Sequence, residues 1–303
     1  ADPASSDRQP NPTPPGEFSV SVDDPNAALR AIYPAGIFSG LLSDKLPGVL
    51  TSTDFRVGAG QRLWLQIAGD GQASNRYVVQ NYPRNGTVYP VNNLAGPKAK
   101  QWHWQEFNLG YWQGDDAHIE LATARDAPLL VKNSDRSWFG IRQAIVTAAE
   151  QKPPVDFHES LSPIFRAAES KNIQSMQDLA TLYQDVIVQA IKAWQSESID
   201  DSQSLLLDAS LRHQLLPNTL AQLPKTKPLI ERYRQLEAEI PVATRAPTVA
   251  EWKGQDQALY VRGDHKQPGV PVPRRFLEAF DASPYQTQLS GRSQFAEDLI
   301  ADE

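Results

Sequence analysis

The apolar pattern changes its period part-way along this chain, and this change limits the possible folds more than any other feature. Between residues 17 and 150, short apolar runs alternate with clusters of Gly, Asn, Asp and Pro. Such runs, rich in β-branched and aromatic residues, are typical of strands joined by turns. The clearest lie at 63–67, 76–79, 118–123 and 138–146. We therefore predict a β-sandwich over 17–150, of the galactose-binding-like jelly-roll kind.

Residues 155–245 follow the helical period instead. One stripe of a helix would hold Leu179, Leu182, Tyr183, Val186, Ala190, Ile191 and Trp194. Ser175 is placed to cap this helix, and Asp178 favours its positive end. A second helix is expected after Thr226, with Pro228 in its first turn. The prediction is a multidomain α+β chain in which an α-helical region follows the sandwich.

Proline marks both ends of the chain. Residues 1–16 are interpreted as a linker or a cloning remnant. Residues 246–303 are predicted to be a Pro-rich segment with a short apolar helix near 276–280, leading into the truncated start of a C-terminal domain at Ser290-Gly291-Arg292.

Composition excludes several classes of chemistry. The chain has no cysteine, which rules out disulfides, thiolate metal sites and covalent c-type haem attachment. Its formal charge of -7 argues against nucleic acid as a partner. No apolar run is long enough for a membrane span. The five histidines form no zinc motif, and no serine-nucleophile elbow or Walker loop occurs. We therefore do not expect this fragment to be an enzyme by itself.

Aromatic residues are dense between positions 75 and 112. Flat rings stack on the C–H faces of sugars, while polar side chains bind the hydroxyls, so a carbohydrate-binding surface is one interpretation. The other is packing, because Trp102 and Trp104 share one face of a strand, and Trp64 is expected to be buried. The candidate ligand contacts are Arg76, Tyr82, Arg84, Tyr89, Trp102, Trp104 and Trp112.

Two further groups are candidates for binding. Asp70 and Asp126 are candidate ligands of a structural Ca²⁺, with solvated acidic turns as the alternative. The other group is basic within an acidic chain and is a candidate interdomain or anion contact, unless its arginines pair with the acidic surface and lock the segment onto the helices. It comprises Arg262, His265, Arg274 and Arg275.

Five short stretches carry a resemblance to a known family: Ile-Tyr-Pro-Ala-Gly at 32–36, Leu-Ser-Asp-Lys at 42–45, Asn-Tyr-Pro-Arg at 81–84, the run 261–276, and Ser-Gly-Arg at 290–292. In them the chain resembles the multidomain cytochrome c-associated proteins of Planctomycetes, which carry paired planctomycete domains of unknown function. The resemblance implies an exported protein, periplasmic or at the cell surface. It also implies haem only in the parent protein, because this fragment has no Cys-x-x-Cys-His motif.

Two main functions follow. The first is non-catalytic recognition of a polysaccharide by the sandwich. The second is a structural spacer that positions the haem and C-terminal domains of the parent, with those domains as its partners. A third reading is part of an enzyme completed by missing domains. Exposed rings on one face would favour sugar binding, whereas buried rings and apolar surface on the helices would favour the spacer.

Overall fold

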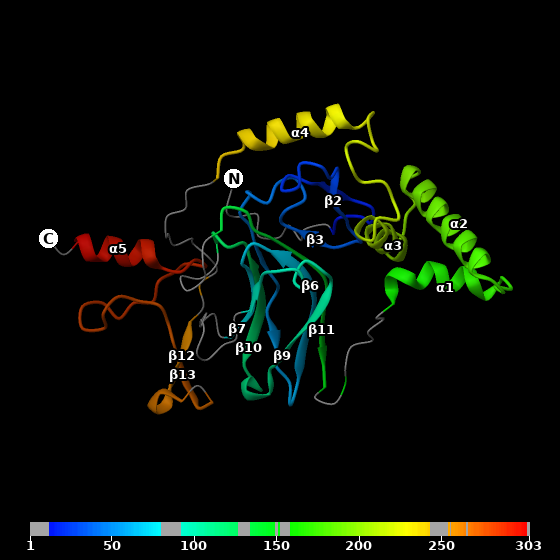
Figure 1. Ribbon diagram of the computed structural model, residues 1–303. Coiled ribbons are helices and arrows are strands. Elements are labelled where there is room, and N and C mark those ends of the chain that lie inside the picture. Colours follow the sequence, from blue (N-terminus) through cyan, green and yellow to red (C-terminus); the bar gives the residue numbers. More distant parts are fainter. Residues whose placement is uncertain are drawn as a thin grey trace. The chain divides into compact units, whose positions relative to one another are not determined.

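The computed structural model describes residues 12–79, 92–126, 134–148, 151, 158–242, 254, 256–264 and 266–301 (Figure 1). The chain divides into two compact units. One unit is residues 10–245, and the other combines residues 1–9 with 246–303. The strands predicted for the first part and the helices predicted after them therefore belong to the same unit.

The β part consists of two antiparallel sheets. The first has the order β4-β10-β7-β8, with β5 also pairing with β10, and the second has the order β3-β11-β6-β9. The first is built from β4 (Val49–Thr51), β5 (Phe55–Arg56), β7 (Ala73–Val79), β8 (Asn92–Leu94) and β10 (Asp116–Ala122). The second is built from β3 (Ile37–Phe38), β6 (Arg62–Asp70), β9 (His103–Asn108) and β11 (Trp138–Thr147).

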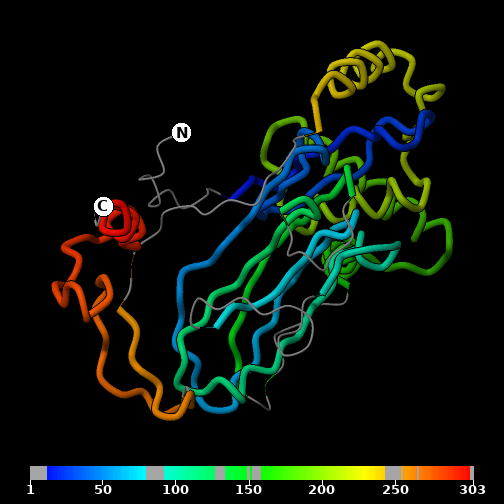
Figure 2. Tube along the Cα trace, turned by 90° about the vertical axis from the view of Figure 1, so that its left-hand side faces the viewer, coloured from blue at the N-terminus to red at the C-terminus, as the bar shows by residue number. Residues whose placement is uncertain are grey.

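The two sheets pack face to face through the side chains that alternate positions of each strand point inward. Leu63, Leu65 and Ile67 of β6 point into one apolar core, which they share with Tyr77 of β7 and Leu121 of β10. Because each strand points every second side chain inward, the core lies between the layers that Figure 2 shows from the side. The predicted sandwich of mostly antiparallel strands is confirmed.

A two-residue connection carries the chain from one sheet to the other. Gly71 and Gln72 join β6 to β7, and both have positive φ, of 64° and 65°. A Cβ atom on Gly71 would overlap the carbonyl oxygen of Arg136, just before β11. The turn therefore requires glycine for its conformation and for the close approach of the two backbones.

Four α-helices follow the sandwich: α1 (Ser162–Glu169), α2 (Met176–Gln195), α3 (Asp201–Arg212) and α4 (Lys227–Glu239), with the short 3₁₀ helix η2 (Glu159–Leu161) before α1. The predicted stripe lies on α2 and packs on α1 and α3. Ser175 caps α2, as predicted, and the structure adds a reciprocal capping box with Asp178. Pro228 lies in the first turn of α4, also as predicted.

The N-terminal segment joins the helices to the sandwich. It contains the paired strands β1 (Phe18–Val20) and β2 (Leu29–Ile32). Asp208 of α3 accepts a hydrogen bond from the backbone N–H of Ile32 at 3.1 Å. Ile32 is itself buried in the apolar cluster of the helices. The N-terminal segment therefore forms a layer between the helices and the sandwich.

Buried charges fix α4, which crosses the top of Figure 1, to the loops of the sandwich. Glu237 is 5% exposed and receives two hydrogen bonds of 2.9 Å from Arg136 and one of 2.6 Å from Ser43. Asp44 is 6% exposed and pairs with both Arg136 and Arg30. We call Arg30, Asp44, Arg136 and Glu237 the α4 clamp.

The second unit is small and largely exposed. Its strands β12 (Gln257–Tyr260) and β13 (Pro268–Val272) pair, with the 3₁₀ helix η3 (Val261–Gly263) between them, and α5 (Arg292–Ala301) follows. The helix predicted at 276–280 is wrong, because these residues form turns. So short a segment, after Pro273 and before Pro284, does not repay the cost of helix nucleation.

Candidate functional site

The outer face of the β3-β11-β6-β9 sheet brings polar and aromatic side chains together. Because Leu63 pairs with Phe107 and both belong to the core, the next pairs along β6 and β9 point outward. We call this outer surface the tryptophan face. Strand register assigns to it Arg62, Trp64 and Gln66 of β6, Trp104 and Glu106 of β9, and Gln143 and Ile145 of β11.

Trp104 and Trp102 lie on the same side of β9, as predicted, but their surroundings differ. Trp102 packs edge-on against Phe38, with ring centroids 5.9 Å apart, and the guanidinium of Arg142 lies 5.8 Å from its ring centre. Trp104 is partly exposed, and its ring stacks on no other ring or cation among the described residues. Trp102 is therefore a packing residue, while Trp104 offers ring surface to a ligand.

Trp64 forms the floor of the face. Only 9% of it is exposed, and its indole N–H donates a hydrogen bond of 3.0 Å to Thr147 Oγ1 on β11. The residue is buried as expected, yet it lies outside the core between the sheets. Its role is to hold the centre of the face rigid.

Gln66 lies between Trp104 and Gln143 in one row across the three strands. It is 9% exposed, and its Oε1 atom has no hydrogen-bond partner among the described residues. A buried amide oxygen without a partner costs about 1–3 kcal/mol, so such atoms are rare unless a ligand or water fills the need. The row therefore contains one unsatisfied acceptor, Gln66 Oε1, to which a hydroxyl can donate.

The charged residues of the face neutralise one another. Arg62 forms an ion pair with Glu106 across the strands, and both side chains are about one third exposed, at 36% and 35%. Gln143 is exposed beside Gln66. The face thus offers two amides and one mutually paired couple of charges.

The structure places two other predicted contacts, Arg76 and Trp112, away from this face. Arg76 lies on the outer side of the opposite sheet, where it pairs with Glu120. Trp112 is 7% exposed in the core and donates a hydrogen bond of 3.2 Å to the hydroxyl of Tyr77. Tyr82, Arg84 and Tyr89 lie outside the described residues. Of the four predicted contacts that the structure describes, Trp104 is the one that strand register assigns to the tryptophan face.

The predicted calcium ligands occupy separate positions in the sandwich. Asp70 forms an ion pair of 2.7 Å with Lys100, and Asp126 lies 3.4 Å from the hydroxyl of Thr123. Within the described ranges, no group of three or more His, Cys, Asp or Glu residues could hold a metal ion. The calcium site stays a prediction.

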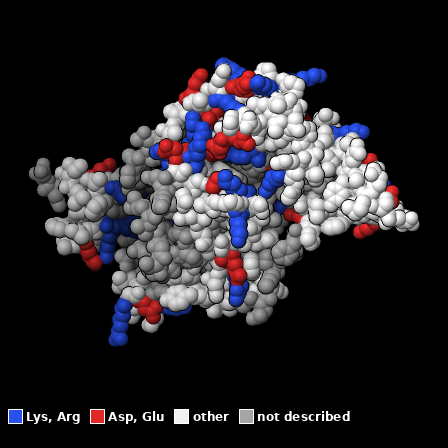
Figure 3. All heavy atoms as spheres, in the orientation of Figure 1, with Lys and Arg blue, Asp and Glu red and all other residues white. Residues whose placement is uncertain are grey.

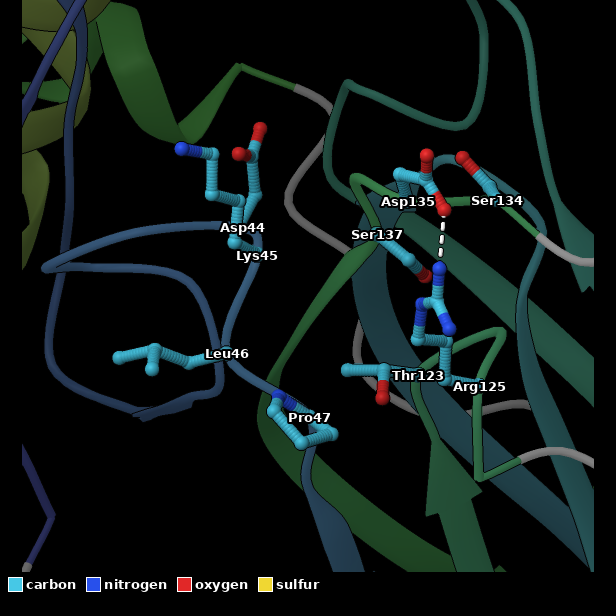
Figure 4. Close-up of a pocket in the computed structure, with 9 residues that line it drawn as sticks. All are labelled: Asp44, Lys45, Leu46, Pro47, Thr123, Arg125, Ser134, Asp135 and Ser137. Atoms are coloured by element: carbon cyan, nitrogen blue, oxygen red, sulfur yellow. Dashed lines mark hydrogen bonds and ion pairs between the residues drawn. The ribbon is translucent and has the colours of Figure 1, made fainter. Parts of the chain in front are cut away.

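A small hollow lies where the loops of the sandwich meet (Figure 4). Asp44 and Lys45 line one side, and the ion pair of Arg125 with Asp135 lines the other. Its volume of about 10 Å³ is at the lower limit for a single water molecule. It is therefore no site for an organic substrate.

The basic residues of the second unit pair locally. Arg274 donates to Asp256 at 3.0 Å, and Arg275 donates to Glu278 at 2.8 Å. These contacts keep the pKa of Asp256 below its usual value, with the hydrogen bond from the Arg274 side chain as the main cause. Arg262 is exposed in η3, and His265 lies outside the described residues. Both carboxylates belong to the same small unit as the arginines, so the expected pairing with the helices stays a prediction.

The comparisons with known proteins give structural likenesses alone. No protein-family model and no curated protein matches the chain. One similar structure is that of TmCBM61 in complex with β-1,4-galactotriose, at 14% identity and a TM-score of 0.25, covering 40% of this chain and 74% of that one. Another is the glycoside hydrolase domain of Endo-D from Streptococcus pneumoniae, at 11% identity and a TM-score of 0.25, covering 40% of this chain and 19% of that one. Among the helices described, none has the length and apolar character needed to cross a membrane.

Proposed function

We propose that the chain recognises carbohydrate without catalysis, through the tryptophan face. The observation that carries this proposal is the buried Oε1 of Gln66, which has no partner in the described part of the chain and lies in a row with Trp104 and Gln143. A sugar hydroxyl would donate to this oxygen while the C–H face of the ring stacks on Trp104. Sugar binding needs both kinds of contact side by side.

The arrangement favours recognition over hydrolysis. Most glycoside hydrolases need two carboxyl groups on either side of the scissile bond. Among the described residues that strand register assigns to the tryptophan face, Glu106 is the one carboxylate, and it is held by Arg62. A group in that position can accept hydrogen bonds from hydroxyls, but it has no second carboxylate on the face to work with.

Replacement of Trp104 tests the proposal. We expect Trp104→Ala to weaken binding of any polysaccharide that the chain takes by at least about fivefold, if loss of a sugar–ring stack costs about the 1–3 kcal/mol found for a base stacked on an aromatic side chain. Gln66→Ala should weaken it by about fivefold. Isothermal titration calorimetry against a polysaccharide panel, with and without Ca²⁺, measures both effects.

Tyr111→Ala is the matched control, because Tyr111 is 64% exposed and lies in the same aromatic-rich stretch but outside the tryptophan face. The affinity of the Tyr111→Ala chain for the polysaccharide should stay within about twofold of that of the parent chain. Equal losses in Tyr111→Ala and Trp104→Ala, or unchanged affinity in a folded Trp104→Ala chain, would remove the face from the binding site.

The wider setting is also part of the proposal. We propose that the sandwich has the galactose-binding-like jelly-roll topology. We further propose that the chain is a region of an exported planctomycete-type protein, which carries haem elsewhere. The support is the set of short sequence stretches that resemble that family, together with the sandwich-then-helix order.

A spacer is the second candidate function, and one observation favours it. The α4 clamp fixes α4 to the sandwich, while Leu229 and Leu236 of the same helix are 71% and 47% exposed. A rigid unit with apolar surface is what a spacer between domains needs. Failure of every polysaccharide to bind would leave this as the preferred function.

A further inference from the structure

We infer that the ligand of the tryptophan face is an uncharged glycan, and not a uronate-containing or sulfated one; this rests on the proposed function and names its ligand class. Acidic glycans are bound by guanidinium or ammonium groups that can turn to the ligand. The cations near the face decide whether such groups are present.

The strands that form the face carry two arginines, and both are already engaged. Arg62 is paired with Glu106 across the strands. Arg142, at the bulge of β11, has a side chain that is only 3% exposed. It donates to Glu159 at 2.7 and 2.8 Å and to Asp201 at 3.1 Å. A carboxylate or sulfate on the ligand would have to displace one of these pairs.

The remaining polar groups suit hydroxyls. Gln66 and Gln143 each carry an amide, which both donates and accepts hydrogen bonds and brings no charge. The unsatisfied atom, Gln66 Oε1, is an acceptor. A hydroxyl can donate to it, whereas an ionised carboxylate or sulfate ester only accepts and would be repelled. The chemistry of the orphaned atom thus selects against an anionic group at the centre of the face.

The overall charge of the chain also favours an uncharged ligand. The chain has a formal charge of -7. On the side that Figure 3 displays, Lys and Arg lie interspersed with Asp and Glu, without an extended area of one sign. A polyanion would therefore gain no general electrostatic attraction on approach.

The first test measures ligand class and salt dependence on the full chain. Calorimetric titrations would use neutral polysaccharides (galactan, xyloglucan, hydroxyethylcellulose) and acidic ones (polygalacturonate, alginate, dextran sulfate). We expect saturable binding in the neutral group, with an affinity that changes less than about twofold between 50 and 500 mM NaCl, because the contacts are not between net charges. Binding to an acidic polysaccharide that falls with salt would overturn the inference.

The second test reverses the sign of charge at one exposed position. Gln143→Lys and Gln143→Glu should bind a neutral polysaccharide with affinities within about threefold of each other, since neither charge meets a charged partner on the ligand. A Lys variant that binds its polysaccharide ten or more times as tightly as the Glu variant would identify an anionic ligand.

The ligand class and the proposed function are overturned by different results. Trp104-dependent binding of an acidic polysaccharide would overturn the ligand class and leave the proposed function in place. No binding in either group, with a folded chain, would overturn both.

Discussion

Glu237→Ala is expected to lower the free energy of unfolding by about 3 kcal/mol, the lower end of the cost of breaking a buried ion pair. The change removes two hydrogen bonds from Arg136 and the one from Ser43. Arg136 keeps Asp44 as a partner and is one third exposed, which is why the upper end is not expected. Urea denaturation of both chains measures the difference.

The same carboxylate gives the clamp a pH dependence. Burial alone raises the pKa of Glu237, but hydrogen bonds from Arg136 and Ser43 and the charges of Arg136 and Lys45 lower it below its usual value. A group with a lowered pKa stabilises the fold above its unfolded pKa of about 4.3 and loses that contribution as pH falls through the folded value. Glu237→Ala should therefore flatten the loss of stability at acid pH.

Glu239→Ala is the control, because Glu239 lies on the same helix and is exposed. Its stability should stay within about 0.5 kcal/mol of the parent chain. Hydrogen exchange adds the location: amides of 227–239 should lose protection in Glu237→Ala and keep it in the control. Equal stability of the two variants would show that the clamp does not hold α4.

Gly71→Ala is expected to have an effect of similar size, about 3 kcal/mol. A left-handed conformation costs an L-residue about 1–2 kcal/mol, and overlap with packed backbone adds about 1–3 kcal/mol. Here the added Cβ would overlap the carbonyl of Arg136, and the φ of Gly71 is +64°. The melting temperature and urea midpoint measure the loss.

Gly114→Ala separates the two causes. Its φ is +88°, but no atom lies within 4 Å of an added Cβ. It should therefore cost only about 1–2 kcal/mol. If Gly71→Ala lowered the free energy of unfolding no more than Gly114→Ala does, the β6–β7 connection would not be packed closely against Arg136.

Local patterns predicted the elements well where each residue acts through its neighbours in sequence. The alternation Leu63-Trp64-Leu65-Gln66-Ile67 places three residues in the core, and the stripe of α2 packs as a helix period requires. The cap at Ser175 needs only the residues beside it. Each of these patterns can be recognised from residues close together in the sequence.

The candidate site depends on register, which the sequence does not state. The alternation already placed Trp64 and Gln66 opposite the core, so their outward direction was available as a signal. Their row with Trp104 and Gln143 needs the pairing of three strands. Aromatic density drew attention to Trp112, but this residue ends a short 3₁₀ helix, Gly110–Trp112, and its bond to Tyr77 holds it in the core.

The α4 clamp is the clearest case of a feature beyond sequence reasoning. Arg136 and Glu237 are 101 positions apart, and Asp44 is a further 92 positions from Arg136. Nothing in the local composition marks any of them. Only the packing of α4 over the sandwich loops brings the charges together, where burial makes each dependent on the others.

The central claim is that carbohydrate binds to the tryptophan face, and side-chain nuclear magnetic resonance tests it most directly. The full chain, labelled with ¹⁵N, would be titrated with the polysaccharide fragment that binds best in calorimetry. The account predicts that the side-chain amide of Gln66 and the indole N–H of Trp104 shift together and saturate at the calorimetric affinity, while the Arg76 side chain on the opposite sheet does not move. Shifts centred on Arg76 and Glu120, with Gln66 and Trp104 unchanged, would contradict it.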